Sequence, residues 1–403
     1  MIRNRFAAMV ALVAVVLLGT GCGERGPAAP PAGGGPSLHP EPTRPAGQAP
    51  PAAAPAPVPD TRPLAARRQD AIARALDYLV QTQAPDGTWC QGNLGITALC
   101  TSALLAGGKT IADPPVRKAI GRVLTFQKPD GGIYDDTGLN NYTTSISLML
   151  LVKADAKAYA APIEKAKTYL VQHQWDEAES IDANHPWYGG AGYGKHERPD
   201  LSNASFFLEA MHQAGVPKDD PLWAKAVVFV SRCQDRSESN DGMIVGADEG
   251  GGMIYSPHKG GESKAGTVDL PNGKRGLKAY ASMTYAGFKS FVYAGLARDD
   301  PRVLAALDWI RHHWSFEENP ELGQQGLYYY YMVAAQALKA WGETTVRDAA
   351  RREHRWKDEL TEAILRRERS PGCWYNEADR WMEGKEIAVV PTSYVVIALV
   401  SCR

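Results

Sequence analysis

The stretch Leu79-Val-Gln-Thr-Gln83-Ala-Pro-Asp-Gly87-Thr-Trp89 contains the pattern that decides the fold. An apolar segment at helical spacing begins before it at Ala75, and a second apolar segment follows it, Thr97-Ala-Leu-Cys-Thr-Ser-Ala-Leu104. Pro-Asp-Gly is turn chemistry, because Pro presets φ, Asp can bond the backbone two residues on, and Gly accepts positive φ. We therefore predict a helical hairpin whose turn is covered by the Trp.

The same order of parts occurs six times along the chain, which is the signature of a repeat architecture. The second copy reads Val123-Leu-Thr-Phe-Gln127, Pro129-Asp-Gly-Gly132 and Thr144-Ser-Ile-Ser-Leu-Met-Leu-Leu151. In the longer copies three to six, first helices are predicted over 166–174, 226–234, 306–314 and 360–368, and second helices begin near Ser202, Ser282, Tyr328 and Thr392. First helices have one apolar face, whereas second helices are apolar nearly all round, so the second set should be buried.

The spacing Leu79-x3-Gln83-x3-Gly87-x-Trp89 resembles the QW-type repeat of squalene and oxidosqualene cyclases and of protein prenyltransferase β subunits. The resemblance covers residues 66–403. It implies an all-α fold, an α/α toroid in which six hairpins form an inner and an outer ring of helices and the first and last repeats touch. The Gln, Gly and Trp of the repeat are then expected to pack one hairpin against its neighbours.

The first 63 residues differ in composition from the rest and predict two further segments. Residues 1–21 place Arg3 and Arg5 before the apolar stretch 6–18, which has the length of a secretory signal and is too short for a comfortable membrane span. The end of this stretch and the residues after it read Leu-Leu-Gly-Thr-Gly-Cys22. This sequence resembles a bacterial lipobox, although Gly19 stands where leucine is usual. Acylation of Cys22 is implied, with an ordinary signal peptide as the alternative.

Residues 22–63 are rich in Pro, Ala and Gly and predict a disordered tether before the domain at 64–403. The aspartate associated with inner-membrane retention is absent after Cys22, where Gly23 stands, so we expect an exported lipoprotein anchored in the bacterial outer membrane.

Charge and composition exclude some classes of function. With 44 Lys and Arg against 45 Asp and Glu the net charge is -1, which gives no indication of a nucleic-acid partner. After Cys22, an odd number of cysteines remains for an oxidising compartment. Three pairings are open: Cys90 with Cys373 across the ring closure, Cys90 with Cys100, and Cys373 with Cys402.

The catalytic signature of the class II cyclases is displaced in this chain. These enzymes protonate an alkene with an Asp-x-Asp-Asp-Thr-Ala motif at the start of an inner helix, where clustered carboxylates raise one another's pKa. Aligning Thr-Ala with residues 144–145 places Asn140, Tyr142 and Thr143 at the acidic positions, while the aspartates at 135–136 come too early and are predicted to lie in a solvated loop. The sequence therefore leaves open whether the protein is an enzyme.

The zinc ligands of the prenyltransferases are not recognisable either. The nearest pairing is Cys233 with Asp235, which has no matching His, and His312 and His313 would point to different faces of one helix. We expect no metal and no other cofactor.

Glycine-rich, aromatic loops precede the inner helices of copies three to five. Because glycine permits close backbone approach and aromatic rings supply flat faces, we predict a ligand site at one mouth of the barrel. Its candidate residues are Trp187, Tyr193, Asp200, Asn203, Tyr255, Tyr280, Tyr285 and Tyr328. Helix packing is the alternative for the aromatic residues, and a helix N-terminal cap is the alternative for Asp200.

Two functional hypotheses follow from these patterns. One is a membrane-anchored, non-catalytic binding or scaffold toroid that takes an apolar or sugar-like ligand at the aromatic mouth. The other is an isoprenoid-modifying, terpene cyclase-like enzyme that lacks the usual acid motif, which the resemblance supports by analogy.

Overall fold

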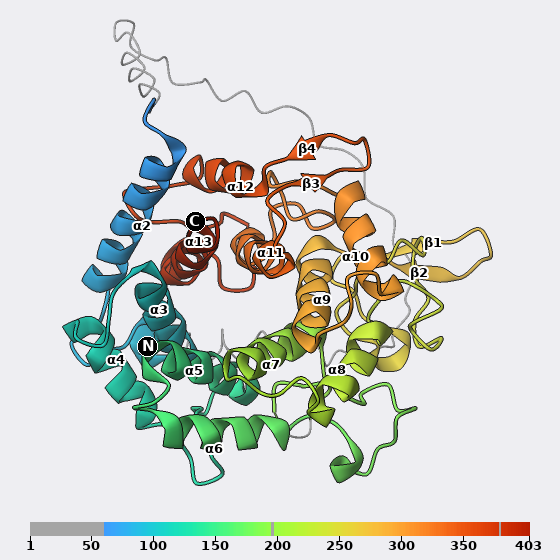
Figure 1. The fold of residues 1–403 in the computed structure, drawn as a ribbon, viewed down its shortest axis with the longest axis horizontal. Helices are drawn as coiled ribbons and strands as arrows, with labels where there is room; N and C mark the ends of the chain where they lie inside the picture. Colours follow the sequence, from blue (N-terminus) through green and yellow to red (C-terminus); the bar gives the residue numbers. More distant parts are fainter. Residues whose placement is uncertain (1–59, 195–196, 379) are drawn as a thin grey trace, which may run out of the picture. The chain divides into compact units, whose positions relative to one another are not determined.

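Figure 1 shows the computed structural model of the chain, which describes residues 60–194, 197–378 and 380–403. The chain divides after residue 62 into two units, and the second, Pro63–Arg403, is compact. The predicted signal segment, Cys22 and nearly all of the tether lie outside the described residues. The second unit is described below.

The described part of this unit contains six helical hairpins, each made of an outer helix followed by an inner helix (Figure 1). The outer helices are α2 (Leu64–Gln81), α4 (Pro114–Leu124), α6 (Ala160–Val171), α8 (Pro221–Arg232), α10 (Pro301–His312) and α12 (Trp356–Leu365). The inner helices are α3 (Leu94–Gly107), α5 (Asn140–Asp155), α7 (Leu201–Gln213), α9 (Ala281–Ala294), α11 (Leu327–Trp341) and α13 (Val389–Ser401). Each inner helix packs on the next, and α13 packs on α3, so the inner ring is closed. The predicted six-hairpin α/α toroid is confirmed.

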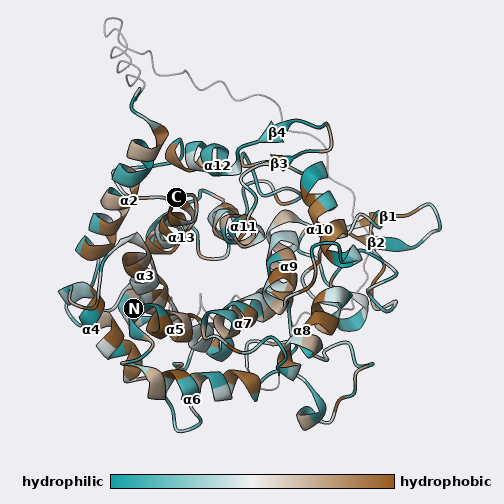
Figure 2. Cartoon of the chain, in the orientation of Figure 1, coloured by the Kyte–Doolittle hydropathy of each residue, from teal (hydrophilic) through white to brown (hydrophobic). Residues whose placement is uncertain are grey.

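The two rings differ in burial as their sequences predict. In α9 the eleven residues from Ala281 to Phe291 are all buried, because neighbouring inner helices and the outer ring cover every side of this helix. The outer helix α2 buries only one stripe, which includes Ile72, Leu76 and Leu79. Figure 2 shows hydrophobic residues where the rings meet and hydrophilic residues along the outer edge.

The Gln and Gly of the repeat join each of the first four hairpins to the next outer helix. The side-chain amide of Gln83 donates to the carbonyl oxygens of Gly87 (2.9 Å) and Pro115 (3.0 Å), and Pro115 lies in the first turn of the next outer helix, α4. Gln127, Gln174 and Gln234 make the same pair of bonds in copies two to four. The repeat therefore encodes the packing between neighbouring hairpins, as predicted.

The Trp of the repeat is buried beneath its own turn. The indole N–H of Trp89 donates to the carbonyl oxygen of Leu79 at 2.9 Å, and Trp374 makes the equivalent bond to Ile364 in copy six, also at 2.9 Å. Each bond ties the end of the turn segment to the last turn of the outer helix before it.

Charged pairs close the ring between copies six and one. Glu368 stands where copies one to four have Gln, and its carboxylate pairs with Arg74 at 2.6 Å and accepts the backbone N–H of Gly372 at 2.7 Å. Arg67 and Glu362 form a second ion pair at 2.8 Å. Two helices about 290 residues apart in sequence are thereby held together.

The structure corrects several predicted boundaries. Outer helices α8 and α10 begin at Pro221 and Pro301, five residues earlier than expected, because Asp220 and Asp300 cap them. Between the helices, the described residues also contain four 3₁₀ turns and two short β hairpins: η1 (Cys90–Gly92), η2 (Glu177–Glu179), η3 (His258–Gly260), η4 (Lys385–Ile387), β1 (Thr267–Asp269) with β2 (Arg275–Leu277), and β3 (Val346–Arg347) with β4 (Glu353–His354).

Candidate functional site

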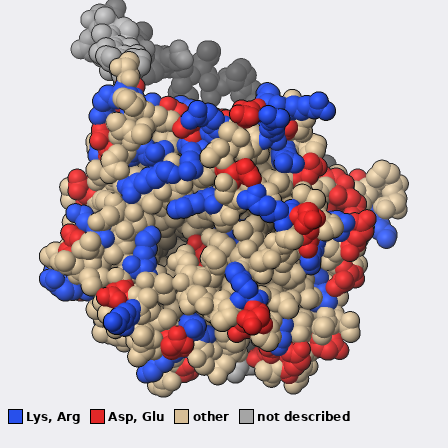
Figure 3. Space-filling view, viewed as in Figure 1, with Lys and Arg blue, Asp and Glu red and all other residues tan. Residues whose placement is uncertain are grey.

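A small cavity of about 70 Å³ lies at the centre of the inner ring. Five inner helices line it with the residues Leu99, Ser102, Ile146, Met149, Lys153, Phe206, Glu209, Gln213, Met332, Gln336 and Ile397. Residues three or four apart share one helix face, so each helix contributes one stripe to the wall. Figure 3 shows a hollow in the middle of the ring, bordered by Lys and Arg side chains.

Hydroxyl groups cross the ring near the N-terminal ends of the inner helices. The Ser202 hydroxyl of α7 bonds the Tyr142 hydroxyl of α5 and the Tyr329 hydroxyl of α11, the latter at 3.1 Å. The rings of Tyr329 and Tyr394 lie 6.0 Å apart. Burial raises the pKa of Tyr142 and Tyr329 well above that of a solvated phenol, so these groups are neutral hydrogen-bonding hydroxyls.

Tyr142 is one of the residues that stand at acidic positions of the cyclase motif. Its phenol cannot replace a protonating carboxyl group, because its pKa lies far above neutrality. Asp135 lies in the loop before α5, where it accepts the backbone N–H of Leu94 at 3.2 Å. Asp136 is exposed, in agreement with the predicted solvated loop. Asp135 is partly buried and bonded to the backbone of Leu94, so its position is structural.

Asp200 is fully buried at the N-terminal end of α7. Its carboxylate accepts the backbone N–H of Asn203 at 2.9 Å and the side-chain amide of Asn203 at 2.8 Å. The Asn203 side chain in turn accepts the Asn141 amide at 3.0 Å. Burial raises the pKa of Asp200 to about 6, while the bonds from Asn203 oppose that rise. The helix-cap interpretation of Asp200 is confirmed.

Three tyrosines gather around Asp200, Tyr193 from copy three and both Tyr255 and Tyr280 from copy four. Tyr193 and Tyr255 share a hydroxyl hydrogen bond of 2.8 Å, and the Tyr255 hydroxyl also stabilises the Asp200 carboxylate. Burial raises the pKa of Tyr280, and Tyr329 and the charge of Asp200 raise it further. Five of the eight predicted site residues therefore form one cluster, but four of them are buried and only Tyr193 is partly exposed.

The other three predicted residues lie elsewhere. Trp187 is partly buried, and its indole N–H donates to His258 at 2.9 Å. Tyr285 packs on Tyr330 with ring centroids 5.6 Å apart, and Tyr328 reaches the carbonyl oxygen of Tyr375 at 3.4 Å. Tyr285 and Tyr328 are each 2% exposed, so their side chains pack between helices and do not face an open mouth of the barrel.

A second buried carboxylate was not anticipated from the sequence. Glu383, which precedes α13, accepts the backbone N–H of Tyr329 at 2.7 Å and the Asn376 amide at 3.0 Å. Burial raises its pKa to about 7. Because Glu383 caps α11 from a loop more than 50 residues later in the chain, no local pattern could have marked it.

A buried ion pair lies at the opposite end of the cavity. Lys289 of α9 contacts Glu209 of α7 at 2.6 Å, and both side chains are less than 5% exposed. Gln336 donates to Glu209 at 2.8 Å and accepts from Lys289 at 3.0 Å, while Gln213 donates to Glu209 at 3.0 Å. Charged residues within otherwise apolar inner helices were the available signal for this site.

Comparison with solved structures places this geometry in context. The type II terpene cyclase MstE from Scytonema, in complex with the substrate geranylgeranyl dihydroxybenzoate, aligns with a TM-score of 0.54 and 13% identity over 84% of this chain and 98% of that one. The chain has the α/α toroid fold of the terpenoid cyclases. MstE in complex with the product merosterolic acid A gives a TM-score of 0.51 and 14% identity, over 84% of this chain and 97% of that one.

A protein from Actinoplanes aligns similarly, with a TM-score of 0.50 and 15% identity over 83% of this chain and 99% of that one. No family model and no curated protein sequence matches the chain. At these identities the terpenoid cyclase-type toroid is shared as a fold, which confirms the architecture implied by the QW-type repeat.

Within the described part of this toroid, no three His, Cys, Asp or Glu side chains come close enough to hold a metal ion. Cys90, Cys100, Cys233, Cys373 and Cys402 are all free thiols, so none of the three proposed disulfides is formed in the structure. Cys233 is buried, and Asp235 accepts the backbone N–H of Ala247 at 2.8 Å.

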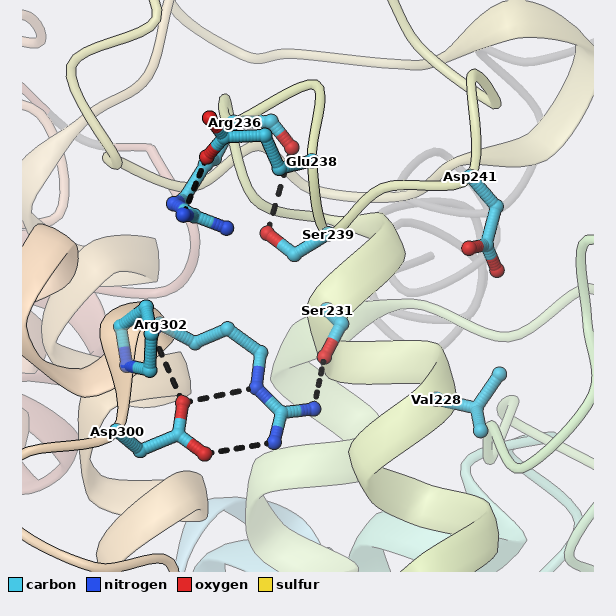
Figure 4. Close-up of a pocket in the computed structure, with 9 residues that line it drawn as sticks. Val228, Ser231, Arg236, Glu238, Ser239, Asp241, Asp300 and Arg302 are labelled. Atoms are coloured by element: carbon cyan, nitrogen blue, oxygen red, sulfur yellow. Dashed lines mark hydrogen bonds and ion pairs between the residues drawn. The ribbon is translucent and has the colours of Figure 1, made fainter.

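A larger hollow of about 340 Å³ lies between α8 and the start of α10, outside the inner ring of the toroid (Figure 4). Arg302 pairs with Asp300 at 2.8 Å and reaches the Ser231 hydroxyl at 3.3 Å, and Arg236 pairs with Glu238. Because these charges already satisfy one another, the central cavity is the stronger candidate for a ligand site.

Proposed function

We propose that the toroid binds an apolar, isoprenoid-like molecule at the centre of its ring and does not transform it. The observation that carries this proposal is the central cavity, whose wall is largely apolar and comes from five inner helices. Such a wall, with a few convergent polar groups, is typical of small-molecule sites.

The positions of the carboxylates support binding over catalysis. Protonation of an alkene requires a protonated acid that faces the bound molecule. Asp200 and Glu383 are both fully buried and engaged in capping inner helices. Glu209 does line the cavity, but its carboxylate is already engaged by Lys289 at 2.6 Å and by the amides of Gln213 and Gln336.

The cavity must expand to admit a long apolar chain. A volume of about 70 Å³ corresponds to only a few water molecules. Met149 and Met332 line the wall, and unbranched methionine side chains adapt readily to new shapes. Binding is therefore expected to move these side chains and to raise the stability of the folded state.

Binding to the full chain can be measured with geranylgeraniol as the probe, by native mass spectrometry and by the shift in Tm. Ile146→Trp fills the cavity and should abolish both signals, whereas Leu304→Trp, at a position 46% exposed on α10, should leave them unchanged. A milder variant, Ile146→Phe, serves if Ile146→Trp fails to fold. Equal binding by the folded cavity variant and the control would overturn the proposed site.

The sugar-like ligand is tested in the same assay with a panel of soluble oligosaccharides. A shift in Tm that survives Ile146→Phe and disappears in Trp187→Ala would place such a ligand at the partly buried Trp187 and not in the ring. That result would contradict the isoprenoid proposal in favour of a rim site.

A catalytic role is the second candidate, favoured by the fold shared with MstE and by Asp200, whose pKa is raised to about 6 among phenols. Geranylgeranyl dihydroxybenzoate incubated with the full chain should be recovered unchanged if the toroid only binds. A cyclised product that forms with the parent chain and not with Asp200→Asn would establish the enzyme instead.

We further propose that the chain is exported and held at the outer membrane by acylation of Cys22, as its first 22 residues suggest. None of the helices in the described residues is long and apolar enough to span a bilayer. Cys22→Ala should move the protein from the membrane fraction to the soluble fraction. Unchanged membrane partitioning of that variant would contradict acylation at this residue.

A further inference from the structure

Two lysines stand at the end of the central cavity that lies away from the tyrosine hydroxyls. Lys153 lines the cavity on α5, one turn beyond Met149. Lys339 lies on α11 three residues beyond the lining residue Gln336, on the same face of that helix. Both side chains belong to exposed residues, so they mark the solvent end of the cavity.

The local charges do not cancel at this end. The carboxylate of Glu209 is compensated by Lys289, and the amides of Gln213 and Gln336 satisfy its remaining hydrogen-bonding capacity. Among the described residues, no acidic side chain forms an ion pair with Lys153 or Lys339. The end of the cavity therefore carries two uncompensated positive charges.

The two ammonium groups influence one another. Although Lys153 is exposed, desolvation where its side chain meets the cavity wall lowers the pKa of its ammonium group, the like charge of Lys339 lowers it further, and the carboxylate of Glu209 opposes this shift. Holding like charges close together is unfavourable unless an anion lies between or beside them. An anion at this position would relieve the repulsion and form charge-assisted hydrogen bonds.

We propose that the ligand is an amphiphile with one anionic head, a carboxylate or phosphate, bound by Lys153 and Lys339 while its apolar chain enters the ring. This inference rests on the proposed binding function. The apolar chain of the ligand would run past Phe206 toward the Tyr142 and Ser202 hydroxyl groups. Lys153 and Tyr142 are eleven residues apart on α5, a rise of about 16 Å, which sets the depth available to the chain.

The test compares three molecules with the same apolar chain in calorimetric titrations of the full protein at low salt. Geranylgeranyl monophosphate and geranylgeranoic acid carry anionic heads, and geranylgeraniol carries a neutral one. Both anions are expected to bind about tenfold more tightly than the alcohol, and this preference should shrink as salt rises. Inorganic phosphate, the head without a chain, should not bind measurably.

The double variant Lys153→Gln with Lys339→Gln should bind all three molecules about equally, at the affinity of the alcohol. The matched control is Lys157→Gln, which removes an exposed positive charge beyond the end of α5 and should keep the tenfold preference. Unchanged circular dichroism and Tm confirm that the variants fold, which is expected because both lysines are exposed.

Each outcome is decisive. Equal affinity of the parent protein for the anions and the alcohol overturns the inference and leaves the proposed apolar binding intact. Absence of binding by all three molecules overturns both. A preference that persists in the double variant, or tight binding of inorganic phosphate alone, contradicts recognition of an anionic amphiphile by these two lysines.

Discussion

Glu383 makes the stability of the toroid depend on pH in a direction opposite to that of ordinary ion-paired carboxylates. Its side chain is fully buried, and its pKa is raised by burial from the ordinary 4.5 to about 7. Above pH 7 the carboxylate is charged in both the folded and the unfolded chain, and its burial opposes folding. Below pH 4.5 it is protonated in both states, and that opposition is lost.

The magnitude follows from the two pKa values. A rise from 4.5 to about 7 corresponds to about 3 kcal/mol of unfolding free energy. The Glu383→Gln variant has no titrating group at this position, so its stability relative to the parent should increase by about 3 kcal/mol between pH 4.5 and pH 8. Weakened bonds to Tyr329 and Asn376 shift the whole curve by a constant that does not depend on pH.

Urea unfolding followed by circular dichroism at several pH values between 4.5 and 8 measures this difference. The other titrating groups are shared by both proteins, so they cancel when the two curves are subtracted. Glu386→Gln is the control, because this exposed residue lies three positions away in the same segment. Parallel curves for the parent and Glu383→Gln would refute the argument that burial dominates the titration of Glu383.

Three further perturbations test the packing of the ring by urea unfolding. Gly189→Ala places a methyl group 1.7 Å from a carbonyl oxygen of the next outer helix and should lower the free energy of unfolding by about 3 kcal/mol or more. Gly215→Ala is the control, because φ is also positive there but no atom lies within 4 Å of the added methyl group, and it should cost about 1 kcal/mol. Equal losses for the two variants would contradict the close approach at Gly189. Gln234→Leu leaves two carbonyl oxygens without their donor and should lower the free energy of unfolding by about 2 to 4 kcal/mol. A loss under about 0.5 kcal/mol would show that the glutamine of the repeat is dispensable for stability. Lys289→Met leaves the buried carboxylate of Glu209 unpaired and should lower the free energy of unfolding by about 3 to 5 kcal/mol. Adding Glu209→Gln to this variant should restore part of that loss. If the losses of the two single variants simply add in the double variant, the two side chains do not interact.

The architecture could be predicted because its information is local and repeated. A helix with one apolar face followed by a second, more apolar helix recurs six times, and the Gln of the first four copies bonds the adjacent hairpin. Outer-helix starts were missed because Asp-Pro pairs such as Asp220 with Pro221 fix them by capping, a signal separate from apolar periodicity. Both β hairpins lie in connections between helices, where that periodicity gives no guidance.

The site was only partly predictable because its contacts join distant repeats. Glycine and aromatic residues correctly drew attention to Tyr193, Asp200 and Tyr255, which do lie together. Whether such residues face an open mouth depends on how neighbouring loops cover them, and here most of the cluster is buried. Glu209 and Lys289 are 80 residues apart, so their pairing emerges only when α7 and α9 pack side by side.

The closed ring also separates the shape of the protein from the order of its repeats. The side chain of Arg403, after α13, donates to the side chain of Gln69 on α2 at 3.0 Å, so the two ends of the toroid lie side by side. A circularly permuted chain that joins 403 to 64 through a short glycine linker and opens between α7 and α8 would retain every helix and every neighbour. The order in which the hairpins are synthesised is therefore not needed for the closed ring, because the contacts between neighbouring hairpins are sufficient to define it.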